Sequence, residues 1–329
     1  MMALTRKHVR MKKELRLVDV YAIATGATLS AGFFLLPGIA AINAGPGLIL
    51  AYLLAALPMI PATFSIIELA TAMPRAGGVY YFLDRSLGPF FGTIGGIGTW
   101  LALVLKVSFA LVGMGAYIAL FLPDLEIVPI AVTIAVALGG INLLGAKKSG
   151  GLQVALVFGL LSLLLVFFTS GAFSMQPLHF EGFLAAGFDN IISTAGLVYI
   201  SYVGVTKVAS LSEEVKDPER NLPRAVFLAL ASAILVYGLG TTVIVGLVPP
   251  DELRGNLSAV ATAAGFALGL PGVVLLSLAA LLAFVSVANA GMLSASRYPL
   301  AMSRDHLLPD VFRRLSRFGT PLHAIAATL

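Results

Sequence analysis

Long apolar stretches alternate with short polar segments along almost the whole chain. Eight of these stretches have about 20 residues or more, the length that a helix needs to cross a hydrocarbon core of roughly 30 Å. They lie near residues 17–43, 46–72, 90–121, 127–146, 150–171, 184–211, 223–248 and 271–302. A ninth begins near Pro321, while residues 257–269 are too few to cross and predict an amphipathic helix on the outer face.

The composition agrees with this pattern. The chain is 59% hydrophobic and 11% charged, with a mean hydropathy of +0.98. Soluble domains have roughly 45–50% apolar and about 25% charged residues, and a soluble chain of this length could not bury so much apolar surface. The sequence therefore predicts an all-α polytopic membrane protein whose partner is the lipid bilayer.

The loop charges predict the orientation. With the N-terminus in the cytoplasm, every lysine and arginine outside the apolar stretches except Arg254 falls on the inner side. Residues 1–16 then form a basic cytoplasmic tail, and the first stretch is a retained helix and not a cleaved signal. We expect a multi-pass protein of the cell membrane, plasma or inner, with a cytoplasmic N-terminus.

Several kinds of chemistry are disfavoured. The chain has no cysteine, and its four histidines are scattered without metal-ligand spacing, so we expect no metal site and no cofactor. The basic residues lie in short loops and not in a patch interleaved with aromatic residues, which argues against nucleic acid. The apolar stretches hold no histidine pair and no second carboxylate near a hydroxyl–lysine pair, so an enzyme is not expected.

The middle of the first stretch contains poor helix formers. Residues 26–38 read GATLSAGFFLLPG, and the sixth stretch carries YISYVGVTKVAS at 199–210. Small residues favour close helix packing in membranes, which is one interpretation. The other is a pair of discontinuous helices around a central site, because unwound backbone is tolerated where it lines a cavity and offers free N–H groups to an anion.

Four segments resemble one known family, in the order in which that family has them. They are GATLSAGFFLLPG at 26–38, ELATAMPRAGGVYYFLDRSLGP at 68–89, YISYVGVTKVASLSEEVKDPERNLPRA at 199–225 and ANAGMLSASRYPLAMSRDHLLP at 288–309. The chain resembles the amino acid/polyamine/organocation (APC) superfamily, and within it the prokaryotic amino acid permeases.

The resemblance implies the leucine-transporter-like fold, built from two inverted repeats of five helices with discontinuous helices 1 and 6. The first repeat would comprise residues 17–171, with membrane helices 1–5. Residues 172–329 would form an incomplete second repeat, with helices 6–8 and the start of helix 9, so we expect a chain truncated within helix 9.

The resemblance also implies a function. A permease of this family would move amino acids across the cytoplasmic membrane by alternating access, as a secondary active transporter that is coupled to protons or sodium or works by exchange. The alternatives are an inorganic-ion cotransporter of the same superfamily and an amino acid sensor that does not transport.

The site residues are carried over from the family motif. The substrate would lie at Thr28, Ser30, Ala31 and Gly32 on the first break, and at Ser201, Tyr202 and Gly204 on helix 6. The sequence departs from the family's usual Gly-Ser-Gly by reading Ser-Ala-Gly at 30–32, which keeps the backbone donors. Tyr199 and Tyr202 are either aromatic gates or packing residues.

Ionisable groups inside membrane spans are costly, so Lys106 and Lys207 are candidates for ion coupling. The family position that holds a lysine in some proton-coupled members corresponds to Gly159, and we expect Lys106 to replace that charge. The alternatives are a structural lysine paired with carbonyl groups at position 106 and a snorkelling lysine at position 207. Ser286 and Asn289 offer oxygen atoms toward the ion position, or hydrogen bonds that only support packing.

Further charges lie near the inner ends of helices 2 and 6. Glu68, Arg75, Glu213, Glu214 and Arg220 are either inner-gate ion pairs or solvated loop charges. Since no acidic residue lies at either break, a neutral or bulky aliphatic amino acid is the expected substrate, and not a cationic one.

Overall fold

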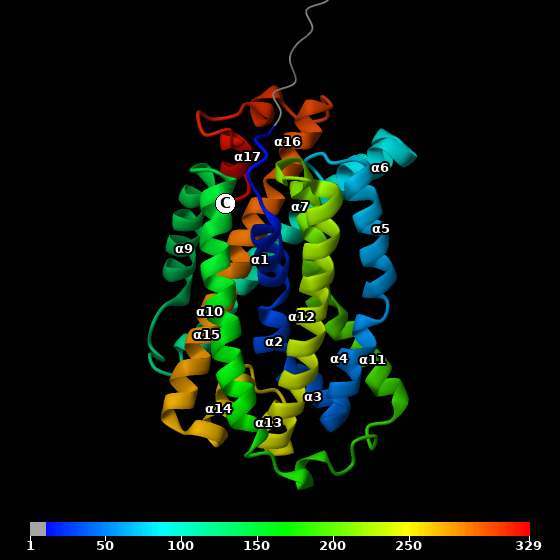
Figure 1. Cartoon of the computed structure of the whole chain (residues 1–329). Helices are drawn as coiled ribbons and strands as arrows, with labels where there is room; N and C mark the ends of the chain where they lie inside the picture. The colour runs from blue at the N-terminus through cyan, green and yellow to red at the C-terminus, as the bar shows by residue number, and fades with distance from the viewer. Residues whose placement is uncertain (1–10) are drawn as a thin grey trace, which may run out of the picture.

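The computed structural model describes residues 11–329, so the first ten residues of the predicted tail lie outside the described residues. Within this range the regular structure is helical, apart from one isolated parallel bridge between Leu15 and Val215. The helices form an elongated bundle (Figure 1). The prediction of an all-helical chain is confirmed.

The first two predicted spans are built from short helices. In chain order these are α1 (Leu17–Thr28), α2 (Ala31–Phe34), α3 (Leu36–Ala44), η1 (Gly45–Gly47), α4 (Leu48–Ala56) and α5 (Met59–Ala72). The connection to the third span contains α6 (Val79–Leu87). The third and fourth spans are α7 (Pro89–Gly113), extended by α8 (Gly115–Ile118), and α9 (Ile127–Leu143).

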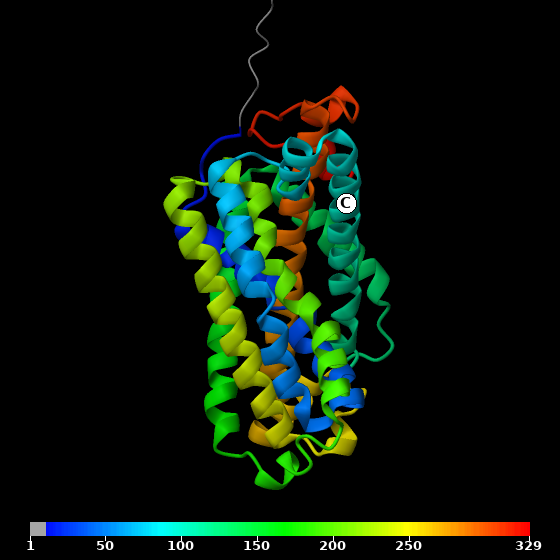
Figure 2. The same cartoon turned by 90° about the vertical axis from the view of Figure 1, so that its right-hand side faces the viewer.

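The remaining helices follow in the predicted order. They are α10 (Ala146–Ala172), η2 (Pro177–Phe180), α11 (Phe188–Val198), η3 (Tyr199–Glu214), α12 (Pro218–Leu247), α13 (Pro250–Leu253), α14 (Ala259–Leu268), α15 (Leu270–Ala295), α16 (Arg297–Arg304), η4 (Asp310–Arg313) and α17 (Leu322–Ala326). The short helix predicted over residues 257–269 is α14. It lies at the end of the bundle opposite to α16 (Figures 1 and 2).

Within the described residues, six helices are long and apolar enough to cross a membrane, and three shorter apolar helices accompany them. The shorter ones include α1, because the first span is interrupted, and α9, which has 17 residues. Apolar side chains also cover the outside of the bundle. Phe90, Leu105, Leu165 and Leu235 are each more than 60% exposed, as expected where lipid and not water is the surrounding solvent.

Helix α1 lies inside the bundle. It packs against α10, α12, α15 and η3, and every residue from Ala22 to Thr28 is buried.

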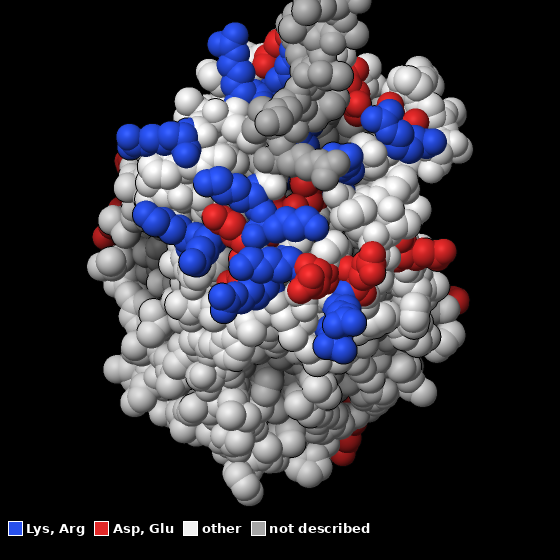
Figure 3. Space-filling model, turned by 45° about the horizontal axis from the view of Figure 1, so that its top comes forward, with Lys and Arg blue, Asp and Glu red and all other residues white. Residues whose placement is uncertain are grey.

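The basic side chains are concentrated at one end of the bundle. Lysine and arginine side chains gather around the end that carries α16 and α17, while the flank below is almost uncharged in this view (Figure 3).

Candidate functional site

The first span is interrupted inside the bundle. Helix α1 ends at Thr28, Leu29 has extended backbone, and Ser30 begins the four-residue helix α2 with φ −154° and ψ −123°. The first N–H groups and the last C=O groups of any helix have no partner within that helix. The interruption therefore places backbone N–H groups without a partner in their own helix beside carbonyl groups that need donors from other helices.

A cavity of about 440 Å³ adjoins this interruption. Its polar wall consists of residues predicted for the site, namely Thr28, Ser30, Ala31, Gly32, Lys106 and Ser201. Its apolar wall comes from α3, α7 and the start of η3. The outer rim is formed by Leu105, Phe109 and Ile200, which are each more than half exposed.

One polar atom in this wall lacks a partner. Ser201 is 3% exposed, and its hydroxyl group makes no hydrogen bond in the structure. A Cβ atom placed on Gly32 would lie 2.5 Å from the Ser201 hydroxyl oxygen, so any larger residue at position 32 would collide with it. A buried hydroxyl group without a partner costs free energy, which marks Ser201 as a group available to a ligand.

We expected the sixth span to unwind near its middle, and it does not. It remains helical and changes from α-helix α11 to 3₁₀ helix η3 at Tyr199, before Ser201 and Gly204. A 3₁₀ stretch within a long helix is uncommon and often marks a functional hinge. Helix η3 approaches α1 very closely at Gly204, where a Cβ atom would lie 2.1 Å from the Ala27 carbonyl oxygen. Glycine is required there because η3 packs directly on the end of α1.

The two predicted gating tyrosines have different environments. Tyr202 is fully buried and donates its hydroxyl to the carbonyl oxygen of Tyr52 at 3.1 Å, and its ring packs edge-on against Tyr237. Tyr199 is partly exposed and packs at the edge of the main core. Neither side chain lines the cavity at the interruption.

Three other tyrosines hold the carbonyl groups of the interrupted span. Tyr237 donates to the Thr28 carbonyl at 2.9 Å, and Tyr52 donates to the Gly32 carbonyl at 2.6 Å. Tyr117 donates to the Phe34 carbonyl at 2.6 Å. All three tyrosines are fully buried. Sequence reasoning missed them, although a hydroxyl in an otherwise apolar span is itself a signal, because a buried tyrosine needs a partner.

Lys106 supplies a fourth donor. Its ammonium nitrogen lies 2.9 Å from the Ala27 carbonyl oxygen, in the last turn of α1. A cation is favoured at a helix C-terminus, where the helix dipole is negative. Of the two interpretations of this residue, pairing with carbonyl groups is observed, and a coupling role stays a prediction. Lys207 shares a small cavity with Lys106, beside Ala27.

Ser286 and Asn289 belong to a buried network of neutral groups. The Gln153 amide donates to Ser286 Oγ at 2.6 Å and to the Ala22 carbonyl oxygen at 3.3 Å. Asn289 donates to Gln153 Oε1 at 2.9 Å, and its own amide oxygen accepts from Asn142 and Ser149. Gln153, and not Gly159, therefore places a polar group of α10 against α1. Gly159 instead faces Leu282 of α15.

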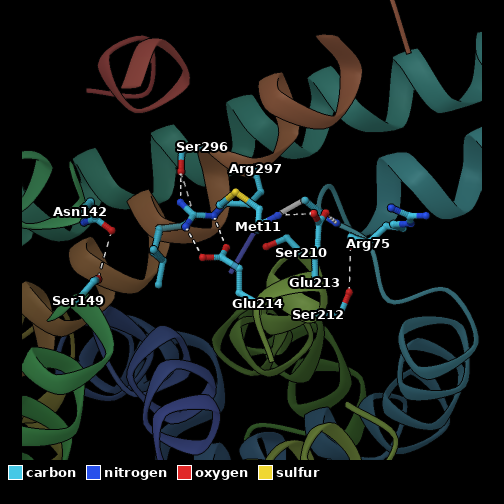
Figure 4. A network of polar contacts seen from close by, with 12 residues as sticks. Met11, Arg75, Asn142, Ser149, Ser210, Ser212, Glu213, Glu214, Ser296 and Arg297 are labelled. Carbon is cyan, nitrogen blue, oxygen red and sulfur yellow. Dashed lines mark hydrogen bonds and ion pairs between the residues drawn. The ribbon is translucent and has the colours of Figure 1, made fainter. Parts of the chain in front are cut away.

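A second polar cluster closes the charged end of the bundle (Figure 4). Glu214 accepts two hydrogen bonds from Arg297, at 2.7 and 2.9 Å, and both residues are buried. Glu213 pairs with Arg304 at 2.6 Å and accepts the backbone N–H groups of Met11 and Ala76. The predicted ion pairs thus exist at Glu213 and Glu214, but with arginines of α16.

The remaining charged residues predicted near the inner ends of helices 2 and 6 are not part of these two ion pairs. Glu68 and Arg220 are exposed, and Arg75 accepts the Ser212 hydroxyl through its backbone carbonyl. Among residues 11–329, no group of three or more histidine, aspartate or glutamate side chains could hold a metal ion.

The fold defines a multi-pass helical membrane protein with a cavity at an interrupted helix. The chain belongs to the amino acid permease family, whose model matches residues 19–329. The superfamily resemblance is thereby confirmed, and the name of the family indicates a transporter.

Three relatives are named for different substrates. A branched-chain amino acid permease of Bacillus subtilis is 29% identical, over 94% of this chain and 71% of its own length. A methylthioribose transporter of the same organism is 27% identical, over 96% and 72%. A vacuolar cationic amino acid transporter of Arabidopsis thaliana is 28% identical, over 97% and 54%. The substrate of this chain must therefore be argued from its own residues.

Proposed function

We propose that this protein is a secondary active transporter that moves amino acids across the cell membrane, and that the cavity at the interruption of helix 1 holds the substrate. The observation that carries this proposal is the buried Ser201 hydroxyl, which lacks a partner and lies in the cavity wall. The cavity combines this hydroxyl with free backbone groups and an apolar wall, and these are the groups that bind an amino acid.

The substrate carboxylate would bind the N–H groups at Ser30, Ala31 and Gly32. These are the first amides of α2, which have no partner within their helix and favour negative charge. The Ser201 hydroxyl would donate a further hydrogen bond. The substrate ammonium would take carbonyl oxygens beside the interruption, around Thr28. Tyr202 and Gly204 would support the site by packing, and Tyr199 would act at its edge.

Alternating access would use the interruption as a hinge and the ion pairs at Glu213 and Glu214 as the closed inner gate. The gathering of basic side chains at that end supports a cytoplasmic position for it, and with it a cytoplasmic N-terminus. In this assignment, opening toward the cytoplasm requires both glutamate–arginine pairs to separate.

Transport would be coupled to protons or would proceed by exchange, with Lys106 as the candidate coupling residue. Lys106→Gln keeps a donor for the Ala27 carbonyl and removes the charge. If Lys106 couples transport, this variant changes the pH dependence of uptake. An unchanged pH profile would refute the coupling role.

The first experiment is thermal stabilisation of the purified full chain by each of the twenty amino acids, at two pH values and with or without sodium. A ligand at 100 times its Kd adds about 2.7 kcal/mol to the stability of the folded state. Stabilisation by one class of amino acid would support the site. No response to any amino acid would overturn it, and uptake into liposomes separates a transporter from a sensor.

A matched pair of variants tests the site itself. Ser201→Ala removes a hydroxyl that has no partner, so the stability of the ligand-free protein should not fall. The same change should weaken substrate binding by about tenfold, the value of one hydrogen bond of about 1.4 kcal/mol. Ser193→Ala, on the exposed face of the same span, should change neither quantity.

A further inference from the structure

Two lysines line a small cavity next to the end of α1, and one of them, Lys106, also lines the proposed substrate cavity. Lys106 lines the 440 Å³ cavity at the interruption, and it also lines the small cavity that Lys207 shares. The two residues come from α7 and η3, and Ala27 at the end of α1 lines the same small cavity. Both are partly buried. The arrangement places the Lys106 charge in the wall of the substrate cavity and the Lys207 charge in the wall of the small cavity that Lys106 shares.

No carboxylate compensates these charges. Among residues 11–329, none of the recorded ion pairs includes Lys106 or Lys207, and neither cavity is lined by an aspartate or glutamate. The Lys106 ammonium contacts only a neutral carbonyl oxygen, that of Ala27. The wall of the cavity therefore carries net positive charge.

The rest of the cavity wall is apolar. Leu36, Leu105, Phe109 and Ile200 line it together with two alanines of α7. A substrate side chain that extends from the interruption meets either this apolar wall or Lys106. An apolar side chain is favoured by the apolar wall, whereas a second ammonium group gains no partner in either place and is repelled by Lys106.

We infer that Lys106, supported by Lys207, makes this site reject amino acids with a cationic side chain relative to uncharged ones of the same length. The inference rests on the proposed function, because it concerns the same cavity. It makes Lys106 a specificity-determining residue, in addition to its contact with α1.

The size of the effect follows from Coulomb's law. With an effective dielectric constant of about 20, a unit charge about 6 Å from the Lys106 ammonium is disfavoured by about 100-fold in affinity. Lys207 does not line this cavity, so it adds a smaller factor of the same sign. Discrimination of about 100-fold between otherwise identical ligands is therefore expected.

The test compares norleucine with lysine, which has the same carbon chain and an added terminal ammonium group. Dissociation constants are measured by thermal stabilisation of the full chain, with the pair glutamine and glutamate as a second comparison. Norleucine should bind about 100-fold tighter than lysine. Glutamate should lose far less affinity relative to glutamine than lysine loses relative to norleucine, because its negative charge is attracted by Lys106. This comparison uses the unaltered protein, so it does not depend on the folding of any variant.

Variants then assign the effect. Lys106→Gln keeps a hydrogen-bond donor and removes the charge. It should lower the ratio of the dissociation constants of lysine and norleucine at least tenfold, through tighter binding of lysine. Lys106→Arg keeps the charge and should keep the ratio. Lys207→Gln should narrow it by a smaller factor, and Lys147→Gln, at an exposed position, should leave it unchanged.

The outcomes separate this inference from the proposed function. Equal binding of norleucine and lysine would overturn the inference alone, as would a loss of affinity from glutamine to glutamate as large as that from norleucine to lysine. An unchanged ratio in Lys106→Gln would remove Lys106 as its cause. If no amino acid bound the unaltered protein, the proposed function would fail, and the inference with it.

Discussion

The buried pair between Glu214 and Arg297 should be one of the most sensitive positions of the molecule. Arg297 is fully buried and Glu214 is 2% exposed, and the arginine donates two hydrogen bonds to the carboxylate. The pair joins the end of the sixth span to α16. Glu214→Gln keeps the shape of the side chain and removes the negative charge, which leaves the Arg297 guanidinium group buried without a counter-charge.

The magnitude follows from the burial of the pair. Removing one partner of a buried ion pair costs about 3–5 kcal/mol, because the remaining charge stays out of water. A cost of about 3 kcal/mol changes an equilibrium constant by more than 100-fold. We therefore expect Glu214→Gln to lower the melting temperature strongly, or to shift the protein toward a conformation in which this end is open.

The two effects are measured separately. Thermal unfolding reports stability, and thiol labelling reports opening, because the chain contains no cysteine and a single introduced one is a clean probe. Ser210→Cys places the probe at a position that is 1% exposed beside the same cluster. In the Glu214→Gln background this cysteine should react much faster. The control is Asp310→Asn, which breaks an exposed ion pair and should cost less than about 1 kcal/mol.

A double variant decides whether the pair, and not the glutamate alone, carries the effect. Arg297→Met together with Glu214→Gln removes the unpaired charge, so it should recover part of the stability lost in the single variant. If the two losses simply add, or if Glu214→Gln changes neither melting temperature nor labelling rate, the reasoning about this cluster is wrong.

Three further substitutions test the interior of the bundle. Gly204→Ala should abolish folding or transport, because the added Cβ atom would lie 2.1 Å from the backbone of α1. The control is Gly98→Ala, whose Cβ atom would meet nothing within 4 Å, and this variant should take up substrate like the unaltered protein. Tyr237→Phe removes the donor to the carbonyl group at the end of α1 and should cost about 1–3 kcal/mol in thermal unfolding. Gln153→Leu leaves Asn289 and its neighbours with unpaired groups, and a similar loss should appear in the same measurement. Melting temperatures that equal that of the unaltered protein would contradict the last two.

Much of the fold was predictable, because the length of an apolar stretch is a local property of the sequence. The predicted spans agree with the helices to within a few residues over most of the chain. The seventh span is an exception. We expected it to begin near residue 223, and it begins at Pro218, where the fixed φ of proline suits the first helical position. Pro223 lies one turn later and is accommodated inside the helix.

The interruption of the first span was also predictable from glycine, serine and threonine in its middle. The conformation of the sixth span was not. Its glycine and hydroxyl residues predicted unwinding, but η3 keeps helical hydrogen bonds in 3₁₀ geometry while Gly204 packs on α1. The same residue types serve unwinding and close packing, so composition alone does not distinguish the two outcomes.

The partners of the interrupted backbone could not be predicted, because they come from helices that are distant in sequence. The carbonyl groups on both sides of the interruption are held by Lys106 of α7, Tyr237 of α12, Tyr52 of α4 and Tyr117 of α8. Unpaired backbone groups are costly in lipid, so each of these donors is needed as long as the helix stays broken. The interruption is thereby tied to four other helices. Any movement of α1 relative to α2 must carry these contacts along or exchange them, and of these four donors only Lys106 lines the cavity.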